Sequence, residues 1–256
     1  RYPMNNLAVS NVSLILAFLL VLVAVFISYR EKLHLSKDIF YSIFRAIIQL
    51  VIVGFVLKYV FQVNNVFLTI AMSLFIVFNA AFNAHKRNPH GHKKYWTSLV
   101  AIFVSTYVTL GVLILAGAIK FVPSQIIPIT GMIASNSMVA IGLCYRNLFS
   151  LFRDQRQQVL EKLALGADSK TASLPILRES IKAAMQPTID SAKTVGLVSL
   201  PGMMSGLIFA GVDPVHAIKY QIMVTFMLLS TTSLGSIIAG YTACKKYYND
   251  DLQLWN

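Results

Sequence analysis

Charged residues are scarce in this sequence. Asp, Glu, Lys and Arg together make up 12% of its 256 residues, about half of their share in an average soluble domain. Hydrophobic residues make up 56%, and the mean hydropathy is +0.66. This balance excludes a soluble globular protein. It predicts an all-α, polytopic membrane protein in which residues 1–256 form a single membrane domain.

Cysteine and the common catalytic motifs are also missing or rare. The two cysteines, Cys144 and Cys244, lie near the predicted cytoplasmic ends of helices, where a structural disulfide is not expected. No G-x-x-x-x-G-K-[ST] loop is present, so the chain does not hydrolyse nucleotide by that route. H-E-x-x-H and G-x-S-x-G are absent as well. We therefore expect a chain that is not an enzyme and binds no cofactor of its own.

Long apolar runs predict about seven membrane spans of roughly 20 residues or more. Each run has to cross as a helix, because lipid offers no hydrogen-bond partner to a bare backbone group. The first run lacks a small-residue cleavage site, so we expect it to be retained as a helix. The predicted spans are residues 9–29, 40–62, 65–84, 96–119, 125–151, 190–211 and 215–243.

The positive charges are divided unevenly between the two sets of helix ends. Of the 22 Lys and Arg residues, 18 fall at one set of ends and loops, and Arg1, Lys58, Lys120 and Lys219 fall at the other. Lys and Arg collect on the cytoplasmic side of membrane proteins, so the amino terminus is expected outside and the carboxyl terminus inside a cell membrane of the bacterial inner or plasma type. The same rule accounts for the net charge of +12 without a nucleic-acid partner.

A histidine-containing loop lies between the third and fourth predicted spans. Residues 84–95 include His85, His90 and His92 together with four basic residues. A His-x-His sequence near another histidine can hold a metal ion. The alternative is a solvated basic turn that sets the topology, and it is favoured because the neighbouring positive charges repel a cation.

The polar stretch 153–189 interrupts the apolar chain. Within it, Val159, Leu160, Leu163 and Ala167 recur at steps of three and four residues, with charged residues off that face. Such spacing is typical of an amphipathic helix.

Further signals in this stretch predict helix ends. Gly166 suits a helix terminus, Asp168 or Ser169 can cap a second helix, and Pro175 allows a new start at Ile176. Two or three short amphipathic helices beneath the membrane are therefore expected. They could rest on anionic lipid or dock into a groove of a cytosolic partner, and the spacing alone does not separate these alternatives.

Polar residues at membrane depth are functional candidates because their burial in lipid is costly. Arg45 and Gln49 lie four residues apart on one helix face, and Asn136 lies in the middle of the fifth predicted span. Asp190 and Lys193 open the sixth span, where Asp190 could pair with Arg45 or Lys193. For Asn136, ordinary interhelical hydrogen bonding is the alternative.

The sixth predicted span contains residues that weaken a helix. Pro201 lacks a backbone donor, and Gly202 and Gly206 loosen the backbone, which predicts a break from Pro201 to Gly206. A broken helix at membrane depth is tolerated where it lines a cavity, as in transporter sites. Met203 and Met204 are candidate soft ligands for a metal, with core packing as the alternative.

Residues 188–206, TIDSAKTVGLVSLPGMMSG, resemble the signature of the FetB (YbbM-like) permeases, a family that includes the plant aluminium-sensitivity permeases. The resemblance extends over nearly the whole chain. Supporting stretches lie at 45–50, 129–138, 163–167, 210–214 and 217–222.

The resemblance implies the permease subunit of an ABC transporter linked, in bacteria, to iron export. A separate cytosolic ATPase would bind ATP and Mg²⁺ and drive the permease. An importer-type interface is not expected, because Leu160 stands where importers have Glu, six residues before Gly166. The coupling residues would be Leu160, Leu163, Ala164, Leu165, Gly166 and Ala167.

One protomer of about seven helices is too small to enclose a path alone, so we expect a homodimer. Arg45, Gln49, Asp190 and Lys193 would support the break in the sixth span. Two alternatives remain: an ion-coupled secondary transporter with Asp190 as carrier, and a non-transporting sensor that signals through 153–189. The path-lining candidates are Asn136, Ser199, Pro201, Gly202, Met203, Met204 and Gly206.

Overall fold

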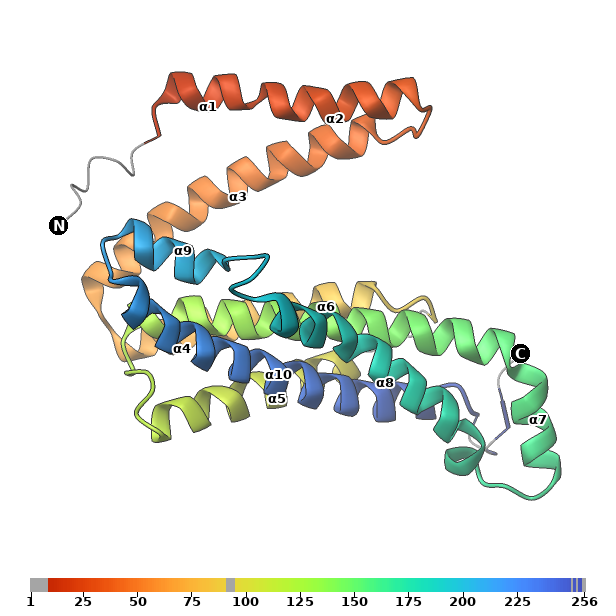
Figure 1. Ribbon diagram of the computed structural model, residues 1–256. Coiled ribbons are helices and arrows are strands. Elements are labelled where there is room, and N and C mark those ends of the chain that lie inside the picture. Colours follow the sequence, from red (N-terminus) through yellow and green to blue (C-terminus); the bar gives the residue numbers. More distant parts are fainter. Residues whose placement is uncertain (1–8, 91–94, 250, 252, 255–256) are drawn as a thin grey trace.

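A computed structural model of the chain describes residues 9–90, 95–249, 251, 253 and 254. These residues form helices joined by short connections, with no named strand among them (Figure 1). The helices are α1 (Asn11–Ala17), α2 (Leu19–Arg30), α3 (Ser36–Val63), α4 (Val66–Lys86), α5 (Trp96–Leu115), α6 (Pro123–Asp154), α7 (Arg156–Ala164), α8 (Ser169–Thr194), α9 (Gly202–Phe209) and α10 (Pro214–Lys245).

Local sequence explains where several helices begin. Asn64 adopts a left-handed conformation after α3, and the Asn65 side chain accepts a hydrogen bond from the Phe67 amide at 2.8 Å to cap α4. Pro123 and Pro214 each stand at the start of a helix, where proline costs no hydrogen bond. These residues make tight connections between successive helices.

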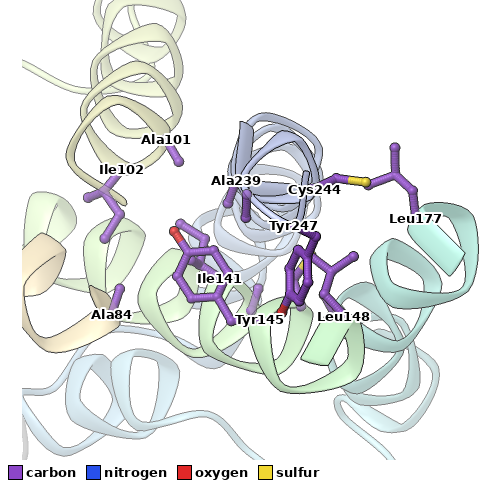
Figure 2. Close-up of a cluster of buried hydrophobic side chains, with 14 of the residues drawn as sticks. Ala84, Ala101, Ile102, Ile141, Tyr145, Leu148, Leu177, Ala239, Cys244 and Tyr247 are labelled. Carbon is purple, nitrogen blue, oxygen red and sulfur yellow. The ribbon is translucent and has the colours of Figure 1, made fainter. Parts of the chain in front are cut away.

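The core lies between α4, α5, α6, α8 and α10, while α1 to α3 project away from this bundle (Figure 1). Figure 2 shows Ile141, Tyr145 and Leu148 of α6 packed near Ala239 and Cys244 of α10. By contrast, α3 buries only one of its residues, Val60. The apolar surface of α1 to α3 is therefore left for lipid or another chain.

Hydroxyl pairs join the bundle helices in the interior. The side chains of Ser98 and Tyr145 are 2.7 Å apart, and those of Ser105 and Ser137 are 3.0 Å apart. Each pair links α5 to α6. Interhelical hydrogen bonds of this kind satisfy polar groups that lipid could not.

Within the described part of the chain, six helical segments are long and apolar enough to cross a membrane: α1 and α2 counted as one segment, then α3, α4, α5, α6 and α10. The prediction of an all-α polytopic membrane protein is confirmed. The sixth predicted span, 190–211, is interrupted as expected, but the interruption lies earlier than predicted, because α8 ends at Thr194 and α9 begins at Gly202. The chain nevertheless passes from one end of the bundle to the other in this region. The helix α8 starts beside α7, and α10 starts beside α9 at the opposite end of the bundle (Figure 1).

The prediction of short helices across 153–189 is wrong beyond Ala164. A single helix, α8, contains both Pro175 and Pro187 in its interior. Its buried residues, which include Ile176 and Leu177, pack along α6 and α10. This packing outweighs the hydrogen bond that each proline removes, so the proline signal alone misplaced the helix start.

The turn between α7 and α8 follows the predicted signals. Gly166 has φ +94°, and the amides of Gly166 and Ala167 donate to the carbonyls of Leu163 and Lys162 in a Schellman arrangement. The Asp168 carboxylate accepts a hydrogen bond from the Thr171 amide at 2.9 Å. Gly166 as a helix end and Asp168 as a helix cap are thus confirmed.

Replacing Asp168 by alanine is expected to loosen the first turn of α8. Hydrogen bonds from Thr171, first from its side chain and then from its backbone, lower the pKa of the Asp168 carboxyl. The cap therefore stabilises the helix above the ordinary aspartate pKa and is lost as the pH falls through the lowered value. Hydrogen exchange at the Thr171 amide should be several-fold faster in Asp168→Ala, whereas Asp168→Asn keeps the acceptor and should exchange slowly. Equal exchange in all three proteins would contradict the capping role.

Candidate functional site: an inner cleft and a docking corner

The break between α8 and α9 covers residues 195–201. Gly196 has φ +83°, and its amide donates to the Ser199 carbonyl at 2.8 Å. The Thr194 carbonyl accepts hydrogen bonds from the amides of Leu197 and Val198, so the loop satisfies its own backbone groups.

The location of this break corrects the prediction from the sequence. Pro201 is the extended residue that precedes α9, and Gly202 is its first helical residue. Gly206 lies inside α9. The break therefore ends at Pro201 and does not extend to Gly206, because proline and Gly202 favour the start of a helix here rather than its interruption.

An inner cleft of about 580 Å³ lies between α6, α8, α10 and the break. Most of the predicted path residues line it together. Met204 instead lines a side hollow of about 400 Å³ on the other side of the loop, and Gly206 lines neither space. The predicted path residues in the inner cleft are Asn136, Ser199, Pro201, Gly202 and Met203.

Gln221 of α10 is a buried polar cleft residue that was not among the predicted path residues. It lines both the inner cleft and the side hollow, together with Thr225 and Val195. Gln221 is only 8% exposed. A glutamine in an apolar helical run is a usable signal, but its position between the two spaces depends on how α10 packs.

The supporting polar residues do not gather around the cleft. Arg45 and Gln49 are exposed on α3, which contributes no lining residue. Asp190 accepts a hydrogen bond from Gln186 at 2.8 Å, and neither Asp190 nor Lys193 lines the cleft. Among the described residues, Asp190 forms no ion pair with Arg45 or Lys193, so the expected pairing of Asp190 is not formed.

A metal centre is not assembled by the described residues. They contain no group of three His, Cys, Asp or Glu side chains able to hold an ion. Met203 and Met204 line different spaces, so their thioethers do not converge. In the predicted histidine loop, His90 stacks on Tyr247 with ring centroids 4.2 Å apart. His92 lies outside the described residues.

A docking corner forms where α7 meets the start of α8 and residues 253–254. It contains a groove of about 690 Å³. Of the coupling residues expected from the resemblance, Leu160, Leu163, Ala164 and Ala167 line this groove. Leu165 is 89% exposed at the turn. Leu165 therefore lies uncovered at the turn that borders this groove.

One helix connects the docking corner to the inner cleft. Ser169 at the start of α8 lines the corner groove, and Ser191 near its end lines the cleft. The rise of an α-helix places these residues about 33 Å apart. Because α8 is continuous between them, it links the corner to the cleft wall.

The spans, the broken helix and the cleft define a multi-pass α-helical membrane protein. Comparison with known sequences then places it more narrowly. The chain belongs to the family described as uncharacterised protein family UPF0014, which it matches over residues 11–248.

Several curated proteins share this family likeness along most of their length. The chain is 61% identical to the Probable iron export permease protein FetB of Escherichia coli K12 over 251 residues, which cover 98% of this chain and 97% of the relative. It is 34% identical to Protein ALUMINUM SENSITIVE 3 of Arabidopsis thaliana, covering 93% and 87%. It is 35% identical to membrane protein STAR2 of rice, covering 91% and 82%. No solved structure matches the chain significantly.

Proposed function

We propose that this chain is the permease subunit of an ABC transporter that exports iron or another metal, driven by a separate cytosolic ATPase. The name of the Escherichia coli relative, which is similar over nearly its full length, supports iron export. The observation that carries the proposal is the continuous helix α8, which joins the docking corner to the inner cleft. A gate that is moved by a separate subunit needs a continuous connection between its docking surface and its transport path.

The geometry suggests how force would open and close the gate. The ATPase binds ATP and Mg²⁺ and seats part of its surface at the docking corner. Movement of the corner shifts α8 as a rigid rod along α6 and α10, which displaces Ala184 and Ser191 in the cleft wall. The loop 195–201 absorbs the change, because it is held to α8 by few backbone hydrogen bonds.

A homodimer fits the same arrangement. The helices α1 to α3 leave broad apolar faces uncovered, and the inner cleft of one protomer has walls from α6, α8, α10, the break and the start of α9. A second copy would supply the remaining enclosure. The ion-coupled alternative is less well supported, since Asp190, its expected carrier, does not line the cleft.

Cells that express the chain together with its ATPase are expected to accumulate several-fold less iron under iron load than cells without it. Cellular iron is measured by mass spectrometry, together with growth under the same load. The matched control replaces the phosphate-loop lysine of the ATPase by alanine, which leaves assembly intact and removes ATP turnover. Equal iron and equal tolerance in all strains would contradict iron export.

A further inference from the structure

The side chain of Gln221 is buried with an acceptor that has no partner among the described residues. The Thr225 hydroxyl donates its single hydrogen to the Gln221 carbonyl at 2.9 Å. Because this hydrogen is used, the Thr225 oxygen can only accept a hydrogen bond from the Gln221 side chain. Gln221 Nε2 lies 3.5 Å from that oxygen. This contact favours the orientation in which Oε1 points away from Thr225, and Oε1 is buried without a hydrogen bond from any described residue. A buried carbonyl left in this state costs stability unless a ligand or an ordered water satisfies it.

A second amide in the inner cleft is oriented in the same way. The Asn136 amide nitrogen donates to the Met132 carbonyl at 2.8 Å. Because that carbonyl can only accept, the nitrogen has to face it and the side-chain oxygen faces away. Asn136 and Gln221 line the same cleft from α6 and α10. Both amides thus use their nitrogen within their own helix and keep the oxygen as an acceptor.

The walls of the inner cleft contain no formal charge. The described lining consists of amides, hydroxyls, thioethers and apolar groups. A bare divalent transition metal is usually held by imidazole, thiolate or carboxylate ligands, and none of these lines the cleft. The cleft is also large, at about 580 Å³, and lies in the range of small-molecule sites.

We propose that the inner cleft binds a neutral ligand that donates hydrogen bonds to Oε1 of Gln221 and Oδ1 of Asn136, with Thr225 as a positioning residue. This inference rests on the proposed function and deepens it. A metal cargo would enter as a complex whose own ligands cancel the charge and present O–H or N–H groups. The same chemistry is offered by a metal-free hydroxylated or amide-bearing small molecule, and the experiment below separates these two sources.

The test measures binding to the full-length chain in lipid nanodiscs. The probes are neutral ferric tris(acetohydroxamate), whose ligands carry N–H donors, the aqueous Fe²⁺ ion, and metal-free acetohydroxamic acid. The chelate is expected to bind more tightly than Fe²⁺. Gln221→Met keeps the length of the side chain and removes the acceptor, so chelate affinity should fall by about three- to ten-fold, the usual effect of one neutral hydrogen bond.

A second pair of variants guards against misfolding of Gln221→Met. Thr225→Val frees the Gln221 amide and should also weaken chelate binding. Thr242→Val on the same helix removes a hydroxyl that bonds only to its own helix and does not line the cleft, so this variant should bind the chelate like the wild type.

Fe²⁺ binding at least as tight as chelate binding would overturn the proposal, as would unchanged chelate affinity in both Gln221→Met and Thr225→Val. Metal-free acid that binds as tightly as the chelate would uphold the neutral site and contradict only the metal cargo of the proposed function.

Discussion

Replacing Leu165 by aspartate is expected to reduce ATPase stimulation by the permease at least about thirty-fold while leaving the permease folded. Leu165 is 89% exposed, so its substitution removes no internal packing. If the docking corner seats the ATPase, the same leucine becomes buried there, and its loss together with the burial of a carboxylate costs about 2–4 kcal/mol, which corresponds to this change. ATP turnover is measured with both subunits in nanodiscs.

The matched control for this experiment is Leu165→Met. It keeps an apolar side chain of similar volume and should preserve coupling. Leu163→Asp is less informative, because Leu163 is half-buried and packs against the core. Wild-type stimulation in a correctly folded Leu165→Asp protein would show that the corner is not the docking surface.

Gly235→Leu is expected to prevent stable folding. A Cβ atom at Gly235 of α10 would lie 2.4 Å from the Ser137 hydroxyl of α6 and 3.4 Å from Ile141. Overpacking of a closely fitted helix pair costs about 1–3 kcal/mol and more for a large side chain. The expected result is loss of monodisperse protein in size-exclusion chromatography. Gly54→Leu is the matched control, since a Cβ there meets nothing within 4 Å.

A double substitution tests the stated cause of this effect. Gly235→Ala alone should lower stability by about 1–3 kcal/mol. Adding Ser137→Ala removes the atom that clashes, and Ser105 keeps a hydrogen bond to the Ile102 carbonyl. The double variant should therefore be more stable than Gly235→Ala, as measured by the thermal midpoint in detergent. A double variant that is no more stable would show that the contact is not limiting.

Many residues of the candidate site could be predicted from the sequence, but their arrangement in space could not. Asn136, Ser199 and Met203 were expected to lie together, and they line one cleft. Asp190 was expected to pair with a basic residue, yet it bonds to Gln186. The difference arises because apolar spacing indicates which residues enter the membrane region, whereas the neighbours of each residue depend on how the helices rotate and cross.

The sequence by itself determined the membrane class, the approximate spans and the local helix ends at Gly166 and Asp168. Hydropathy and helix capping depend on residues that are close together in the sequence, so both can be predicted without knowledge of the fold. Only the tertiary structure decided that α8 runs unbroken through Pro175 and that Gln221 is buried at the cleft. Both outcomes depend on contacts between α6, α8 and α10, which are distant in sequence and outweigh local propensity.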